Sequence, residues 1–163
     1  MLSRDQKDAA SGAMVANRLL LGEADAGTYI LLVRLPEAMP VRVGGLGVFD
    51  LQAGYYLYVG SALRGLRSRL ARHLRVEKRL HWHIDYLLAA APVTEIWAHC
   101  GKERYECIWA RALAASGELL PSVARFGASD CDCPTHLFYS PSRPRLQALS
   151  GFLPGVPKIV WSL

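Results

Sequence analysis

The fold of this chain is decided by residues Ala53–Arg79, which read AGYYLYVGSALRGLRSRLARHLRVEKR. Tyr55–Tyr58 is a short aromatic and aliphatic run of the kind that forms a buried strand. Val59-Gly60-Ser61 is a turn signal, and the segment that follows repeats leucine at steps of three and four residues, which is the spacing of one helix face. This order predicts a strand, a tight turn and a helix.

The predicted helix carries the whole positive surplus of the chain. Arg64–Arg79 contains seven Lys or Arg residues and one acid, so its net charge is +6. The chain as a whole has a net charge of +5, and the remainder therefore sums to about −1. This concentration favours a polyanionic partner, with a solvated helix face as the alternative. The residues expected to contact a nucleic acid are Arg64, Arg67, Arg72, Arg75, Lys78 and Arg79.

Length and composition indicate one globular domain. With 163 residues, of which 52% are hydrophobic and 20% charged, the chain can bury a core of ordinary size. No apolar run approaches about 20 residues, so we expect no membrane span, and the N-terminus lacks the pattern of a secretory signal. Four unevenly spaced cysteines do not form a disulfide scaffold, so we expect the reducing cytoplasm. Oligomeric state is left open.

Strand and helix signals continue on both sides of the opening stretch. Residues 1–26 are expected to be a partly loose extension, with a helical turn or two in Ala13–Leu21. Repeated proline marks residues 141–163 as an irregular tail that packs on the domain. Further strands are expected at Gly27–Val33, Val93–His99, Leu137–Tyr139 and, at a sheet edge, Lys158–Trp161. Val41–Leu51 is expected to form a hairpin or an extended insert. Helices are expected at His81–Leu88 and Glu103–Ala115.

Two short motifs resemble the paired signatures of the GIY-YIG nuclease superfamily. Residues 27–29 read GTY and residues 58–60 read YVG, in the order that the superfamily requires. The blocks HWHIDYLL (residues 81–88) and FGASDCDCPTHLFY (residues 126–139) look like an uncharacterised branch of the same superfamily. The resemblance covers roughly residues 27–140.

The resemblance also extends to single residues. In the superfamily, a helix with an essential arginine follows the second signature, and a later helix carries a metal-binding glutamate. Arg69, with His73 one helical turn later, resembles the essential arginine, and Glu106 resembles the metal-binding glutamate. Arg67 competes for the arginine role, because the spacing from Gly60 is one residue longer than usual.

The resemblance implies both a fold and an activity. The fold is a small α/β domain with a central three-stranded, mostly antiparallel sheet flanked by helices. The activity is metal-dependent endonucleolytic hydrolysis of phosphodiester bonds in DNA repair or processing, with DNA a better expectation than RNA. A carboxylate at Glu106 suits Mg²⁺ or Mn²⁺, since both prefer oxygen ligands and keep several waters.

The residue types fit that chemistry. Arg69 offers a planar, permanently charged fork to phosphate oxygens. The general base that accepts a proton from the attacking water is Tyr29, Tyr58 or His73, and the residue types do not decide among the three. Tyrosine acts as a base only if a nearby cation and arginine depress its pKa from about 10, whereas histidine starts nearer neutrality.

A second group of ligand-capable residues follows in the loop before Leu137. Cys131, Cys133 and His136 combine thiols with imidazole, a set that suits zinc, and Cys100 or Cys107 is available to complete it. The alternative for the cysteines is burial as small hydrophobic residues. Two further histidines, His81 and His83, point to different faces of their predicted helix and make a poor ligand pair; with Asp85 and Asp130 they can instead line a nucleic-acid groove.

Other functions compete with nuclease activity. Many superfamily members carry an asparagine shortly after the metal-binding glutamate, but the only asparagine here is Asn17. The chain can therefore be a nucleic-acid-binding module that kept the fold without efficient cleavage. A further alternative is a zinc-stabilised interaction domain with an acidic protein partner. The structural alternative for Glu106 itself is an ordinary ion pair with Arg104 or Lys102.

Overall fold

The computed structural model describes residue 3, residue 6 and residues 13–163. Its centre is a six-stranded sheet in the order β6-β7-β4-β1-β5-β8, in which all neighbouring strands are antiparallel. The strands are β1 Gly27–Leu35, β4 Gly54–Ala62, β5 Val93–Cys100, β6 Leu120–Pro121, β7 Leu137–Ser140 and β8 Lys158–Ser162. A separate hairpin pairs β2 Met39–Val43 with β3 Gly47–Leu51 through the 3-10 turn η1 Gly44–Leu46.

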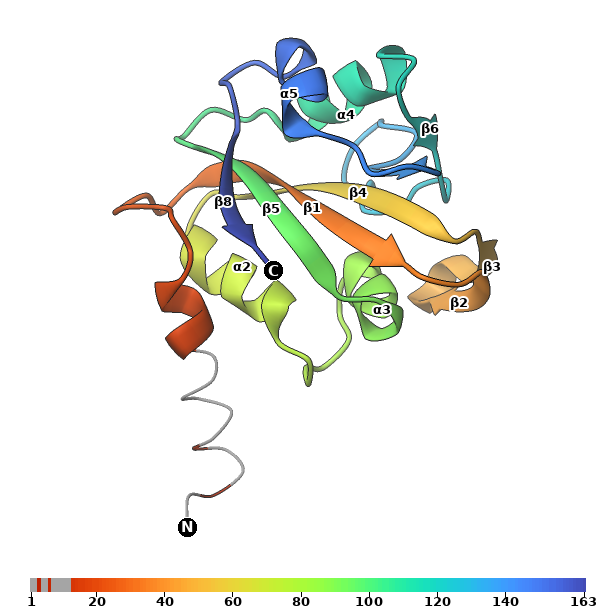
Figure 1. The fold of residues 1–163 in the computed structure, drawn as a ribbon, viewed down its shortest axis with the longest axis horizontal. Helices are drawn as coiled ribbons and strands as arrows, with labels where there is room; N and C mark the ends of the chain where they lie inside the picture. Colours follow the sequence, from red (N-terminus) through yellow and green to blue (C-terminus); the bar gives the residue numbers. More distant parts are fainter. Residues whose placement is uncertain (1–2, 4–5, 7–12) are drawn as a thin grey trace.

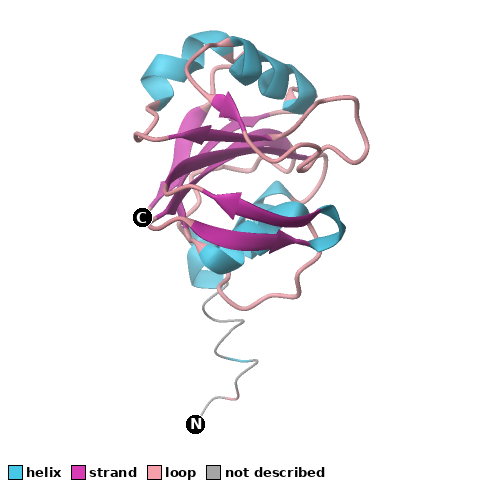
Figure 2. Ribbon diagram, turned by 90° about the vertical axis from the view of Figure 1, so that its right-hand side faces the viewer, coloured by secondary structure: helices cyan, strands magenta, loops and turns pink. Residues whose placement is uncertain are grey.

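Helices cover both faces of the large sheet (Figures 1 and 2). On one face lie α2 Leu66–Leu74 and α3 His83–Ala90, and the hairpin packs beside α3. On the other face lie α4 Glu106–Ala115, α5 Leu146–Leu149 and the 3-10 turn η2 Ser150–Phe152. The chain is therefore a mixed α/β structure of three layers, as the sequence predicts in outline.

Strand β1 is apolar because it is buried from both sides. Tyr29, Leu31 and Val33 lie in the core under α2 and α3, whereas Ile30 and Leu32 lie in the core under α4 and α5. Successive strand side chains point to opposite faces, so a central strand between two helical layers needs a continuous apolar run instead of alternation.

The expectation of a three-stranded sheet is wrong, since the sheet has six strands. Strand β7 pairs with β4, opposite Tyr56 and Leu57, and β8 pairs with β5, opposite Ile96. A three-stranded sheet would leave the outer backbone groups of β4 and β5 unpaired, and these added strands satisfy them. The segments themselves were recognisable as strands, but their pairing depends on contacts between distant parts of the chain.

The expected turn at Val59–Ser61 is also wrong. Strand β4 continues through these residues to Ala62, and the chain turns before α2 at Gly65, whose φ of +64° is left-handed. Helix α2 is consequently shorter than the basic segment: Leu63 precedes it and is 54% exposed, and the residues from Arg75 onward follow it.

The segment before β1 lies beside the C-terminal strand β8. Residues 13–17 are helical, Leu19 and Leu21 are buried, and the Leu20 N–H donates to the Val160 carbonyl at 2.9 Å. The expectation of a loose N-terminus also concerns residues 1–2, 4–5 and 7–12, which lie outside the described residues. Among the residues that are described, no helix combines the length and the apolarity needed to cross a membrane.

The pairing of β1 with β4 requires a glycine at position 60. Tyr29 lies opposite Gly60 in the register, and the tyrosine ring covers the glycine. A Cβ atom added to Gly60 would lie 2.7 Å from the ring carbon Cζ and the hydroxyl of Tyr29. The ring is 2% exposed and cannot move aside without disturbing its own packing.

We expect Gly60→Ala to lower the free energy of unfolding by about 1–3 kcal/mol, because it overpacks this contact. Urea denaturation followed by circular dichroism measures the change. The matched control is Gly45→Ala, since a Cβ atom at Gly45 meets nothing within 4 Å. Equal stability of the two variants would contradict the steric role of Gly60.

Candidate active site and metal-binding cluster

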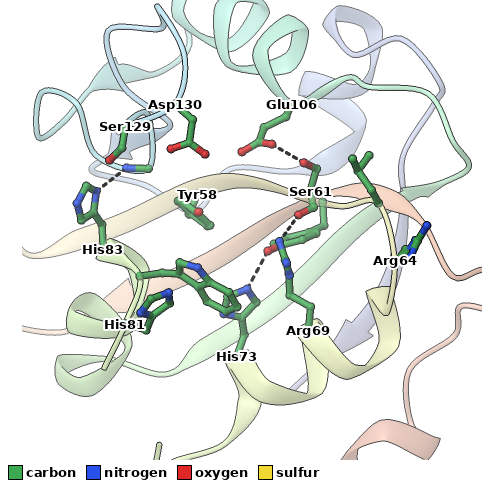
Figure 3. A pocket seen from close by; sticks show the side chains of 14 residues that line it. Tyr58, Ser61, Arg64, Arg69, His73, His81, His83, Glu106, Ser129 and Asp130 are labelled. Atoms are coloured by element: carbon green, nitrogen blue, oxygen red, sulfur yellow. Dashed lines mark hydrogen bonds between the residues drawn. The ribbon is translucent and has the colours of Figure 1, made fainter. Parts of the chain in front are cut away.

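The residues predicted for catalysis, together with the predicted Mg²⁺ or Mn²⁺ ligand Glu106, line one open pocket of about 600 Å³ (Figure 3). Its lower wall comes from α2 and its upper wall from α4 and the loop before β7, with the sheet between them. The predicted residues that it brings together are Tyr29, Tyr58, Arg69, His73 and Glu106. Side chains from both helical layers thus reach one space at the end of β4.

Arg69 is held in this pocket by two contacts. Its Nη1 donates a hydrogen bond of 2.6 Å to the Ser61 carbonyl. Its guanidinium carbon lies 4.9 Å from the centre of the Trp82 ring, within the range of a cation–π contact. These contacts fix the plane of a half-buried guanidinium that still borders the pocket.

Glu106 is the first residue of α4, and its carboxylate is held from two sides. The Ser61 hydroxyl donates to Oε2, and the Nδ1 atom of His136 lies 3.2 Å from Oε1, within ion-pair distance but without the alignment of a full hydrogen bond. The side chain keeps 29% of its surface exposed. Its partners are therefore not Arg104 or Lys102, as in the alternative interpretation of the sequence.

Ser61 was not identified from the sequence, although it joins the two main groups of the pocket. Its carbonyl binds Arg69 and its hydroxyl binds Glu106. The sequence feature that could have identified Ser61 is its position directly after the second signature. Because a turn was expected at Val59–Ser61, Ser61 was not expected to lie in a strand with its carbonyl and hydroxyl both directed toward the pocket.

Tyr29 and His73 form a buried pair under the pocket. The Tyr29 hydroxyl lies 2.8 Å from His73 Nε2. Burial, with the neighbouring Tyr58, raises the pKa of Tyr29 well above its ordinary value, although Arg69 acts in the opposite direction. Burial, followed by the Lys78 charge, lowers the pKa of His73 to about 3. Both groups are neutral near pH 7, and the tautomer of His73 decides which of the two atoms donates this hydrogen bond.

The other tyrosine and a third histidine are also neutral. Burial and the Glu106 carboxylate raise the pKa of Tyr58. Burial lowers the pKa of His83, whose Nδ1 accepts a hydrogen bond of 2.9 Å from the Gly127 N–H. The neutral His83 ring therefore carries its proton on Nε2, where it can donate to a ligand.

The six basic residues predicted to contact nucleic acid fall into two groups. Arg64, Arg75 and Arg79 are exposed, and Arg64 also lines the pocket. By contrast, Arg67 donates to the carbonyls of Ala16, Leu19 and Gly22. Arg67 thus ties the N-terminal segment to α2 and does not line the pocket, whereas its competitor Arg69 does.

Arg72 and Lys78 likewise bind protein groups. Arg72 makes two hydrogen bonds of 2.8 and 2.9 Å to the carboxylate of Asp85, which is fully buried. Burial raises the pKa of Asp85, but Arg72 and two backbone N–H groups outweigh it and hold that pKa below its ordinary value. Lys78 donates to the His73 and Arg75 carbonyls at the end of α2. Asp85 therefore does not line a groove, whereas Asp130, His81 and His83 do border the pocket.

A cluster of metal-ligating groups lies behind Glu106. The thiols of Cys107, Cys131 and Cys133 and one ring nitrogen of His136 all lie within 4.8 Å of one another. Cys107, offered by the sequence as one of two completing ligands, comes from α4; the other, Cys100, is exposed at the end of β5. This Cys/His cluster, with three thiols and one imidazole, can bind a metal ion.

Comparison with protein families supplies one match. A family described as "Domain of unknown function DUF123" matches residues 28–152. The chain belongs to this DUF123 family. No protein of curated function and no solved structure matches the chain. The DUF123 region contains the pocket residues and all four members of the Cys/His cluster, and it ends before β8.

The buried imidazole of the DUF123 pocket has a consequence for acid stability. An unfolded histidine binds a proton below about pH 6.5, whereas folded His73 does so only below about 3. The unfolded state therefore binds more protons in this window, and stability falls as the pH falls.

We expect His73 to contribute a loss of about 2 kcal/mol in the free energy of unfolding between pH 7 and pH 5. His73→Gln should remove this part of the pH dependence, whatever its effect on stability at pH 7. Urea denaturation of both proteins at the two pH values measures the difference. Parallel stability curves would show that His73 is not held neutral by the fold.

Proposed function

We propose that this DUF123 protein is a metal-dependent endonuclease that hydrolyses phosphodiester bonds in nucleic acid. The observation that carries the proposal is the meeting of Arg69 and Glu106 at Ser61. One comes from α2 and the other from α4, in opposite helical layers, and both border the same open pocket. A fixed guanidinium opposite a fixed carboxylate suits a phosphodiester and a divalent cation bound side by side.

The resemblance to the GIY-YIG nuclease superfamily supports this interpretation. Its two signature tripeptides, residues 27–29 and 58–60, lie on β1 and β4, which are neighbouring antiparallel strands. The glycine of the second signature is needed by the tyrosine of the first, since Gly60 contacts the Tyr29 ring. The two signatures are thus in direct contact in the fold, which argues against a chance match to those of the superfamily.

The donors at the pocket fit a hard divalent cation. Glu106 offers a partly exposed carboxylate, and Asp130 lies beside it on the upper wall with its own carboxylate facing the same space (Figure 3). Oxygen ligands with open room for water suit Mg²⁺ or Mn²⁺. When bound, such a cation would neutralise charge on the phosphate and stabilise the leaving oxygen.

The remaining residues bind and orient. The Arg69 guanidinium binds phosphate oxygens from the lower wall, and its contact with Trp82 keeps its plane fixed. The protonated hydroxyls of Tyr29 and Tyr58 donate or accept hydrogen bonds and so orient the attacking water. When Nε2 of His73 is unprotonated, Tyr29 can take the water proton as its own phenol proton passes to that nitrogen, which lies 2.8 Å from the phenol oxygen.

We expect the chain to nick supercoiled plasmid or cleave branched DNA in the presence of Mg²⁺ or Mn²⁺. Arg69→Ala and Glu106→Gln should each lower the rate by about 100-fold or more, because each removes charge stabilisation in the transition state. Gel assays under single-turnover conditions measure the rates. The matched controls are Arg111→Ala and Glu103→Gln, which are exposed residues outside the pocket and should cleave at the wild-type rate.

The low pKa of His73 favours a second function, nucleic-acid binding without efficient cleavage. A base with a pKa of about 3 accepts a proton at a high energetic cost near neutral pH. DNA binding that survives Glu106→Gln, without cleavage by the wild type, would select this function and exclude the nuclease.

Both functions require an electrostatic contact between the exposed arginines and phosphate groups. We expect Arg64→Ala to weaken DNA binding and to reduce the slope of log affinity against log salt concentration by about 1. Fluorescence anisotropy with a labelled duplex at several salt concentrations measures this slope. Arg143→Ala is the control, because Arg143 pairs with Glu95 and does not border the pocket. An unchanged slope for Arg64→Ala would remove this residue from the interface.

A further inference from the structure

The Cys/His cluster has the composition and spacing of a closed zinc site. In a tetrahedral site with zinc–sulfur bonds of about 2.3 Å, the ligand atoms lie about 3.8 Å apart. The four ligand atoms here lie within 4.8 Å of one another, so a shift of under about 1 Å closes the site. Three thiols and one imidazole fill all four positions, which is typical of a structural zinc ion and leaves none for a substrate.

The ligands are presented by a loop that is already fixed by other contacts. The Arg125 guanidinium donates to the carbonyls of Cys131 and Cys133 at 2.9 and 3.0 Å. The His136 N–H donates to the Phe126 carbonyl, and the His136 carbonyl accepts from the Val59 N–H. The loop is therefore tied to itself and to β4 on one side, and Cys107 reaches it from α4 on the other.

His136 stands between this cluster and Glu106. Its ring is 2% exposed, its Nε2 lies 3.5 Å from the Cys131 thiol, and its Nδ1 lies 3.2 Å from Glu106 Oε1. A metal ion takes the lone pair of one ring nitrogen, and the proton must then sit on the other. With the metal on Nε2, the proton sits on Nδ1, 3.2 Å from Glu106 Oε1, and a turn of the ring aligns the two for a hydrogen bond.

We propose that Cys107, Cys131, Cys133 and His136 bind one zinc ion, and that zinc-bound His136 positions Glu106 by donating a hydrogen bond from Nδ1 to its carboxylate. The zinc ion has no contact with the substrate. It fixes the tautomer and the orientation of His136, and through them the carboxylate in the neighbouring pocket. The first part of this proposal, the zinc site (the zinc half), does not depend on the proposed function. The second part, the positioning of Glu106 by His136 (the positioning half), rests on the proposed function, because there Glu106 binds a separate Mg²⁺ or Mn²⁺ ion.

The zinc half is tested by elemental analysis of the full chain purified without added metal or chelator. We expect one zinc ion per chain in the wild type and in Cys100→Ser, which removes the cysteine outside the cluster. Cys131→Ser and Cys133→Ser should lose zinc. If a serine variant does not fold, the site is tested in the wild type by exchanging its metal for Co²⁺. We then expect the absorption bands of thiolate-to-cobalt charge transfer. Stoichiometric iron, no bound metal, or a disulfide within the cluster would overturn the zinc assignment.

The positioning half is tested by His136→Cys. This variant offers a set of four thiolate ligands, which also binds zinc, but it removes the ring nitrogen beside Glu106. We expect the variant to keep one zinc ion per chain while its affinity for Mn²⁺, measured by electron paramagnetic resonance without nucleic acid, falls about tenfold or more. Glu106→Gln supplies the reference for loss of the Mn²⁺ site.

The outcomes separate the two proposals. Equal Mn²⁺ affinity in the wild type and in zinc-loaded His136→Cys would overturn the positioning role. A His136→Cys variant without zinc would overturn the closed four-ligand geometry on which that role depends. A third result is that the wild type holds zinc but shows no Mn²⁺ binding that Glu106→Gln removes. This result would overturn the proposed cation site and the positioning role, but the zinc site would stand.

Discussion

The register between β1 and β4 is the constraint on which the rest of the structure depends. It places Tyr29 over Gly60, and this close contact leaves no room for a side chain at position 60. With that register fixed, Ser61 comes at the end of β4 with its carbonyl toward Arg69 and its hydroxyl toward Glu106. A slip of one residue would send every side chain of the strand to the opposite face and separate these groups.

The pocket combines a neutral floor with a charged rim. The tyrosines and His73 are held uncharged by burial, whereas Arg69 and Glu106 each have a fixed polar partner and border the open side of the pocket. Charges placed over such a floor are weakly screened from below and act strongly on an anion at the rim. The buried Arg72–Asp85 pair lies outside this arrangement and joins α2 to α3.

Local sequence patterns predicted most elements of this protein and several residues that line its candidate site, but not their partners. The leucine spacing located α2, and the apolar run at residues 27–33 located β1, because those signals depend on neighbours in the chain. The role of Arg67 could not be read in the same way, since its three carbonyl partners lie 45–51 residues away. Ser61, the Asp85 pair and the six-stranded pairing were missed for the same reason: burial and register decide them. Cys107 became distinguishable from Cys100 only when α4 was placed beside the loop.

Glu106 and Cys107 are consecutive residues at the start of α4, yet one lines the open pocket and the other belongs to the Cys/His cluster. In a helix, neighbouring side chains diverge by about 100°, so the rotation of this first turn sets both directions together. A change in the rotation of this turn would turn the carboxylate and the thiol away from their partners at once. The hydrogen bond from the Tyr105 N–H to the Thr28 hydroxyl fixes the residue before the turn, and it therefore bears on the pocket and on the Cys/His cluster together.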